Sequence, residues 1–323
     1  MPHFPALAKA QPGERMELPI NRIYRLIRML ESLRTGDESV GFLVELGPIA
    51  IEPLREFLLK GQPSKIFQPR LWAVKALARL EAREVLVTYL FQEREIPDPE
   101  EKLGEEAVES AAARFLTNWP DEEMRRLLLQ LSERRLLNGL IDALAEFRTL
   151  EAIPYFERAL EDDFYRSAAE NAFLRLGTLA GDSLSQAAVT PHPGPSTETP
   201  GSLKRRRTVV RLLNNLGISA ANWQVLRSLL RETDAELVVA AAKIGIELAS
   251  EEDRKLMAHR LTGFLSSTPW HLGKDIEKNL VALKLEAANE IEKEIVLRLE
   301  QPEDARGHDV RLRALLRVKR RWE

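Results

Sequence analysis

The feature that most constrains this sequence is an apolar spacing that recurs along its length. Residues 46–80 contain four apolar positions at i, i+3, i+4 and i+7, the spacing that places side chains on one face of an α-helix. These positions are Ala73, Ala76, Leu77 and Leu80. Because two of the four are Ala, a neighbouring helix can approach closely on this face. We therefore expect a helix that packs tightly against others.

An earlier apolar run in the same stretch predicts a partner helix. It extends from Ile49 to Leu58. Gly61 and Pro63 follow and end it. The two runs together predict a pair of helices joined by a short turn. Pro53 falls inside the first helix, where it removes a backbone hydrogen bond, so we expect a bend there.

The same four-point spacing returns at intervals of 28 to 40 residues, a length that suits one helix pair per repeat. The leading positions are Ser39, Ala73, Ala112, Leu140, Ala169, Val209, Ala241, Ile276 and Arg311. The sequence therefore predicts an all-α fold, an α-solenoid (superhelix) of roughly eight to nine antiparallel helix pairs.

Two stretches carry a more specific motif. The first contains Ala50, Ile51, Pro53 and Leu54, followed by Arg70, Ala73, Ala76, Leu77 and Leu80. The second contains Ala152, Ile153, Pro154 and Phe156, followed by Arg166, Ala169, Ala172, Phe173 and Leu176. This pattern resembles a HEAT-type (HEAT-like) helical repeat. The resemblance implies that the second helix of each pair lines a concave surface.

The domain organisation follows from these repeats. Residues 1–16 contain three prolines and a glycine and predict a flexible N-terminal arm. We expect residues 17–323 to form a single HEAT-like solenoid. The segment 190–203 is rich in proline and lacks apolar periodicity, so it predicts a mobile inserted loop. A domain boundary at this loop is an alternative.

Composition limits the classes of function. The 323 residues are 44% hydrophobic and 30% charged, with a formal net charge of -3, so no strong overall field draws the protein to nucleic acid or to a membrane. The absence of cysteine excludes disulfides, thiolate metal sites and cysteine nucleophiles. No secretory signal or membrane-spanning run is present, so we expect a cytoplasmic protein without a membrane partner.

No catalytic or cofactor motif is present. The five histidines are scattered and form no metal-ligand pair, and phosphate-binding glycine patterns are absent. Adjacent acids such as Glu105 and Glu106 are more simply explained by helix ends and solvated turns than by a general acid and base. We therefore expect a protein that is not an enzyme and that holds no cofactor or metal.

The candidate partner-binding residues come from the helical register. Helical spacing places Trp72, Lys75 and Arg79 beside the apolar stripe, toward solvent. Six of the nine residues that lie two positions after the leading residues are basic. The full candidate set is Trp72, Lys75, Arg79, Arg114, Arg211, Lys243, Lys278 and Arg313. A row of cations suits an acidic protein segment or a phosphate backbone, although Lys and Arg are also common on exposed helix faces.

Three functions remain open. The first is a non-enzymatic scaffold that binds a protein partner, one with an acidic segment, through its concave face. The second is nucleic-acid binding, aided by the basic cluster 204–207 and the basic C-terminal helix. Its extreme form would resemble the DNA glycosylases built from HEAT-like repeats. The third is the function of the HEAT-like lyase subunits that attach bilins, which this sequence resembles in its type of repeat. The sequence leaves the oligomeric state open.

Overall fold

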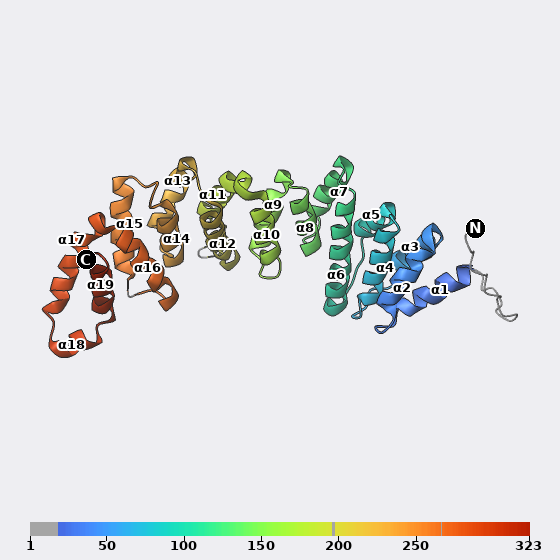
Figure 1. Ribbon diagram of the computed structural model, residues 1–323, viewed down its shortest axis with the longest axis horizontal. Helices are drawn as coiled ribbons and strands as arrows, with labels where there is room; N and C mark the ends of the chain where they lie inside the picture. Colours follow the sequence, from blue (N-terminus) through green and yellow to red (C-terminus); the bar gives the residue numbers. More distant parts are fainter. Residues whose placement is uncertain (1–18, 196–197, 266) are drawn as a thin grey trace, which may run out of the picture. The chain divides into compact units, whose positions relative to one another are not determined.

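A computed structural model describes residues 19–195, 198–265 and 267–323, and these residues form an all-α protein (Figure 1). In this described part of the chain, the extended structure assigned is an isolated β-bridge between Pro193 and Glu198. The predicted all-α class is confirmed. The predicted arm, residues 1–16, lies outside the described residues.

The chain divides into two compact units, residues 1–143 and 144–323. The division falls inside helix α8 (Asn138–Glu146) and not at the proline-rich segment, where the sequence suggested a possible boundary. A single continuous solenoid stays a prediction.

Unit 1 is built from two layers of helices. Its elements are α1 (Pro19–Leu30), α2 (Gly36–Glu45), η1 (Gly47–Ala50), α3 (Ile51–Lys60), α4 (Gln68–Arg79), α5 (Arg83–Phe91), α6 (Pro99–Phe115), η2 (Leu116–Asn118), α7 (Glu122–Ser132) and the first residues of α8. Helices α2, α4 and α6 pack in series, and α1, α3 and α5 pack in series beside them. The second helix of each pair therefore stacks on the second helix of the next.

Unit 2 repeats this arrangement. Its elements are η3 (Leu150–Ala152), α9 (Ile153–Leu160), α10 (Arg166–Leu176), η4 (Gly177–Ala180), α11 (Gly181–Val189), α12 (Pro200–Leu216), α13 (Ala220–Leu226), η5 (Arg227–Arg231), α14 (Ala235–Gly245), α15 (Glu251–Phe264), α16 (Trp270–Ala282), α17 (Lys284–Leu299), α18 (Glu303–His308) and α19 (Val310–Arg320). Helices α10, α12, α14, α16 and α19 pack in series. In the other layer α11 packs on α13, and α15 packs on α17.

The apolar spacing identifies the buried face of most second helices. Of the nine leading positions, Ser39, Ala73, Ala112, Leu140, Ala169, Val209, Ala241 and Ile276 are buried. The pattern is wrong at Phe42 and Leu248, which are 44% and 40% exposed. In α4, Val74 and Ala78 are buried as well, because α4 is covered by α2 on one side and by α6 on the other.

A left-handed turn residue follows several second helices. Helices α2, α4, α8, α10 and α12 are followed by residues with positive φ, namely Gly47, Glu81, Arg148, Gly177 and Gly217. This conformation ends a helix by redirecting the chain, and glycine adopts it without strain. The turn lets the next first helix start at a defined place.

Pro53 occupies a different place from the one expected. Helix α3 begins at Ile51, so Pro53 lies in its first turn and not in its interior. A proline there removes an N–H that has no partner within the helix in any case. The reason for expecting a bend at Pro53 is therefore gone.

An arginine closes three of the helix pairs. Arg70 donates from Nη1 to the carbonyl of Gly61 at 3.0 Å, and Arg166 donates from Nε to the carbonyl of Leu160 at 2.8 Å. Arg206 donates from Nε to the carbonyl of Ala188 at 2.7 Å. Each arginine lies three residues before a leading position and reaches the carboxyl end of the preceding helix. The last carbonyls of a helix lack partners within it and carry partial negative charge, so a guanidinium stabilises them.

Replacing Ala76 with Leu tests the stacking of α4. Ala76 has no exposed surface. We expect Ala76→Leu to lower the free energy of unfolding by about 1–3 kcal/mol, because extra methylenes do not fit between packed helices. Urea denaturation followed by circular dichroism measures the change. Ala282→Leu, at an exposed helix position, is the control. Equal stability of both variants would mean that α4 is not tightly packed at this point.

Candidate partner-binding site

Three of the predicted site residues meet in unit 1. Trp72 and Lys75 of α4 and Arg114 of α6 line a pocket of about 360 Å³. Leu71, Ala111, Phe115 and Asp37 complete its lining. The pocket lies between consecutive second helices, so it is a product of their stacking. Its walls combine two aromatic rings and aliphatic side chains with a charged rim.

Trp72, which the sequence predicted to point toward solvent, is half-buried. One edge of its ring packs against the start of α2, where a Cβ atom on Gly36 would lie 1.9 Å from a ring carbon. Gly36 therefore makes room for the indole. The stripe reasoning missed this contact because it considered one helix at a time, whereas the ring reaches the neighbouring repeat.

The two cations of this pocket are held by carboxylates. Lys75 Nζ lies 2.8 Å from Oδ1 of Asp37, and Arg114 Nε lies 2.7 Å from Oδ2 of Asp142. All four side chains are at least one-third exposed, so these ion pairs contribute little to stability. They do cancel the local charge, and they set each cation at a fixed place on the rim.

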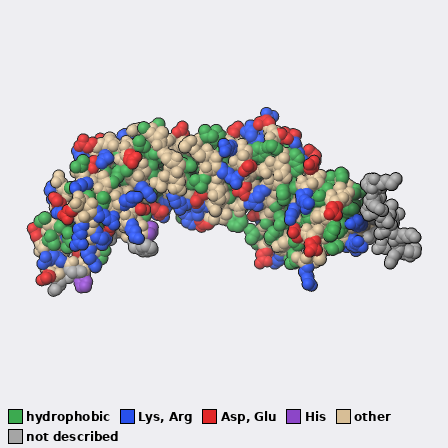
Figure 2. Space-filling view, in the orientation of Figure 1, with side chains coloured by type: hydrophobic (Ala, Val, Ile, Leu, Met, Phe, Trp, Pro, Cys, Tyr) green, Lys and Arg blue, Asp and Glu red, His purple; other side chains and the backbone are tan. Residues whose placement is uncertain are grey.

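Two further predicted residues meet in unit 2. Arg211 of α12 and Lys243 of α14 line a cavity of about 280 Å³ that also includes residues of α16. Arg211 Nη2 lies 2.7 Å from Oε1 of Glu170. Among the described residues, no carboxylate lies within 4 Å of the Lys243 ammonium group. Figure 2 shows Lys and Arg side chains gathered over the part of unit 2 that contains α12, α14 and α16.

The remaining predicted residues are exposed on separate helices. Arg79 lies in the last turn of α4, Lys278 lies on α16 and Arg313 lies on α19. The structure thus groups Trp72 with Lys75 and Arg114, and groups Arg211 with Lys243. The use of any of these residues in binding stays a prediction.

The basic cluster 204–207 is not a free cationic patch. All four residues belong to α12, and each is paired within unit 2. Lys204 pairs with Asp163, and Arg207 pairs with Asp234 and Glu236. The expectation that this cluster could contact nucleic acid is not supported by these contacts, since the carboxylates already neutralise it.

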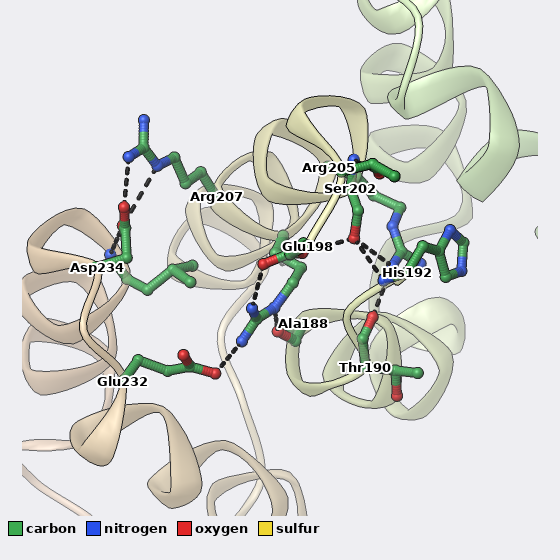
Figure 3. A network of polar contacts seen from close by, with 12 residues as sticks. Ala188, Thr190, His192, Glu198, Ser202, Arg205, Arg207, Glu232 and Asp234 are labelled. Carbon is green, nitrogen blue, oxygen red and sulfur yellow. Dashed lines mark hydrogen bonds and ion pairs between the residues drawn. The ribbon is translucent and has the colours of Figure 1, made fainter. Parts of the chain in front are cut away.

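Arg206 is the centre of this network. Figure 3 labels its partners Ala188, Glu198 and Glu232. The Arg206 side chain is 2% exposed, and it bonds Glu198 at 2.7 Å, the Ala188 carbonyl at 2.7 Å, and Glu232. It thereby joins α11, α12, the segment before α12 and the segment before α14. Burying a guanidinium requires such partners, because the charge would otherwise lack solvation.

The segment before α12 is shorter than predicted. Thr199 caps α12 and Pro200 is its first residue, so residues 200–203 belong to this helix and not to the predicted loop 190–203. The Ser202 hydroxyl accepts the His192 N–H at 2.8 Å, and Arg205 donates to the Thr190 carbonyl at 2.6 Å (Figure 3). The sequence rule failed because it read helix-starting residues as loop residues.

Asp234 shows the electrostatics of the network. Its Oδ1 accepts the Leu237 N–H at 3.0 Å and caps α14. Burial acts to raise the pKa of Asp234, but the hydrogen bonds from Arg207 and from the Leu237 N–H outweigh burial and hold the pKa below its ordinary value. The ionised form therefore stabilises the fold at neutral pH, and this contribution is lost as the pH falls through the lowered pKa.

One acidic residue was misjudged from the sequence. Glu105 is 2% exposed, in contrast to the solvated turn that was expected. Its carboxylate accepts hydrogen bonds from Arg70 at 2.7 and 2.8 Å, from the Tyr89 hydroxyl at 2.7 Å and from Arg94 at 2.6 Å. These contacts join α6 to α4, to α5 and to the segment that follows α5. Glu105 is therefore a structural centre of unit 1.

Comparison with known proteins finds similarity in solved structures alone. No family model matches the sequence, and no curated protein matches it. The structure of the complex of CpcE and CpcF of phycocyanin lyase from Nostoc sp. PCC7120 is 17% identical, and the match covers 86% of this chain and 100% of that chain with a TM-score of 0.34. An engineered protein is 19% identical over 82% of this chain and 98% of its own, with a TM-score of 0.26.

The first of these matches corrects one prediction. The expectation that the protein is not an enzyme is contradicted, because the matched chain belongs to a phycocyanin lyase, and we do not retain it. With 17% identity and a TM-score of 0.34, the match assigns no activity, substrate or partner to this chain.

None of the helices in the described residues has the length and apolar character needed to cross a bilayer. No group of three or more His, Asp or Glu side chains in these residues is placed to hold a metal ion.

Replacing Arg206 with Ala tests the buried network. The change leaves Glu198 and Glu232 without their buried cation, so we expect the free energy of unfolding to fall by about 3 kcal/mol, near the lower end for a broken buried ion pair. Urea denaturation measures it. Lys204→Ala breaks an exposed ion pair in the same helix and should cost at most about 1 kcal/mol. A smaller loss for Arg206→Ala than for Lys204→Ala would contradict the assignment.

Proposed function

We propose that this protein binds a segment of a partner protein, and that the segment inserts a large apolar side chain between Trp72 and Phe115. The observation that carries this proposal is the pocket of about 360 Å³ between α4 and α6. Apolar, aromatic pockets with a few placed polar groups are the usual form of recognition sites. Tryptophan is also enriched among the few interface residues that contribute most of the binding energy, and Trp72 is half-buried at this pocket.

The rim defines what flanks that apolar side chain. Lys75 and Arg114 stand at the pocket with exposed carboxylate partners, Asp37 and Asp142. An acidic residue of the partner can share or replace these carboxylates without a large desolvation cost. We therefore infer a segment with an apolar anchor beside Asp or Glu, which agrees with the predicted acidic partner.

Nucleic acid fits this pocket less well. A phosphate backbone requires cations whose charge is not already cancelled, because release of counterions supplies most of the affinity. Here each rim cation lies within 3 Å of a carboxylate oxygen. The balance of charge therefore favours a protein segment, and the concave placement of the surface stays an expectation from the repeat resemblance.

Selection from a random peptide library on the whole protein tests this proposal. We expect the selected peptides to share a large apolar residue next to Asp or Glu. Their affinity should fall at least about tenfold in Ala111→Trp, because the new indole fills the pocket while leaving Trp72 and its contacts in place.

Two further variants make the result specific. Trp72→Ala should lose binding as well, and its melting temperature shows how much of the loss is due to unfolding. Lys102→Ala changes an exposed residue of α6 that lies outside the pocket lining, and it should bind normally. Peptides that bind Ala111→Trp as well as they bind the unchanged protein would refute the proposal, as would selection of no consensus.

A further inference from the structure

We propose that the cavity between α12, α14 and α16 in unit 2 is a second site, one that captures the C-terminal carboxylate of a polypeptide ending in an apolar residue. The cavity measures about 280 Å³. It belongs to unit 2 and uses none of the residues of the Trp72 pocket, so the two proposals stand or fall separately.

Lys243 differs from the other predicted cations that line a pocket. Lys75, Arg114 and Arg211 each lie within 3 Å of a carboxylate oxygen. Lys243 has no carboxylate within 4 Å among the described residues, and it lines a cavity. An exposed, unpaired ammonium group at a cavity wall is a preformed partner for an anion.

The neighbours of Lys243 add further donors. Arg211 uses Nη2 for Glu170, which leaves its other N–H groups available. Asn214, which is exposed on α12, lines the same cavity and offers two amide N–H groups. One carboxylate can therefore receive hydrogen bonds from two helices, α12 and α14. Charge-assisted hydrogen bonds of this kind are stronger than hydrogen bonds between neutral groups.

The floor of the cavity is apolar. Val239 is 2% exposed and Leu272 is 9% exposed, and both line the cavity. The ligand must therefore carry an apolar group close to its anionic group. A C-terminal apolar residue meets this condition, because its carboxylate and its side chain are attached to the same carbon. An internal Asp or Glu has its carboxylate at the end of its side chain and lacks a separate apolar group.

The acidic wall of the cavity limits the charge of the ligand. Glu236 and Asp275 line it together with the cations. Glu236 is paired with Arg207 at 2.9 Å, whereas Asp275 has no ion pair within the described part of the chain. Asp275 can accept a peptide N–H of the ligand, and it repels a second negative charge. The site therefore suits a monoanionic carboxylate and not a phosphate dianion or a nucleic-acid backbone.

A set of matched small ligands tests this proposal. The probes are the tripeptide acetyl-Gly-Ala-Leu with a free carboxylate, the same peptide with a C-terminal amide, and inorganic phosphate. Binding to the whole protein is followed by ligand-observed NMR. We expect the free acid to bind and the amide and phosphate to bind at least about tenfold more weakly, since a hydrogen bond to a charged group is worth that much.

Variants of the protein place the effect. Lys243→Met removes the charge while keeping the length of the side chain, and it should weaken binding of the free acid about tenfold. Lys274→Met, at an exposed lysine of α16 outside the cavity lining, should leave binding unchanged. Circular dichroism verifies that both variants fold.

The opposite outcomes are equally clear. Equal binding of acid and amide, or no binding of either, overturns the proposal. Tighter binding of phosphate shows a general anion site and also overturns it. Equal losses in Lys243→Met and Lys274→Met, or a single-stranded oligonucleotide that competes with the free acid, would point to a diffuse cationic surface in place of a carboxylate site.

Discussion

Three of the helix pairs depend on a contact between an arginine in the first two turns of the second helix and the last carbonyls of the first helix. Arg70, Arg166 and Arg206 each make this contact. It satisfies carbonyls that the helix itself leaves without partners, and it places a positive charge at the negative end of the helix dipole. Two helices joined in this way form a helix pair with an apolar face, and the next helix pair must cover this face.

The stacking of these helix pairs decides which side chains on the surface are free to bind a partner. The second helices α2, α4 and α6 pack in series in unit 1, and α10, α12, α14, α16 and α19 do so in unit 2. Charges from neighbouring helices meet across these contacts, as in the pairs of Lys75 with Asp37 and Arg211 with Glu170. Lys75, Arg114 and Arg211 are therefore already neutralised. Specific recognition is left to places where side chains leave a cavity or a charge without a partner.

The sequence predicted what depends on neighbouring residues in the same helix. The spacing at Ala73 and Ala169 correctly identified buried faces, because one helix repeats its face every three or four residues. It also selected Trp72, Lys75 and Arg114, which meet in one pocket. Phe115 lines the same pocket. Its position three residues after Ala112 predicted a core residue, but its ring is only half-buried.

Contacts between distant residues were not predictable in this way. The partner of Arg70, Glu105, lies 35 residues away, and the partner of Arg211 lies 41 residues away. No periodicity links such residues, so the sequence did not predict that Glu105 is buried or that the cluster 204–207 is paired with carboxylates. The contact of the Trp72 ring with Gly36 was missed for the same reason, since Gly36 belongs to another repeat.

The central claim, that a partner segment seats its apolar side chain against Trp72, is tested most directly by fluorine NMR of protein labelled with 5-fluorotryptophan. Trp72 is half-buried at the pocket, whereas Trp223 is 1% exposed in unit 2 and serves as an internal reference. The Trp72 signal is assigned from the Trp72→Phe variant. A saturating selected peptide should shift the Trp72 signal and leave the Trp223 signal in place. An unmoved Trp72 signal at saturation would contradict the account.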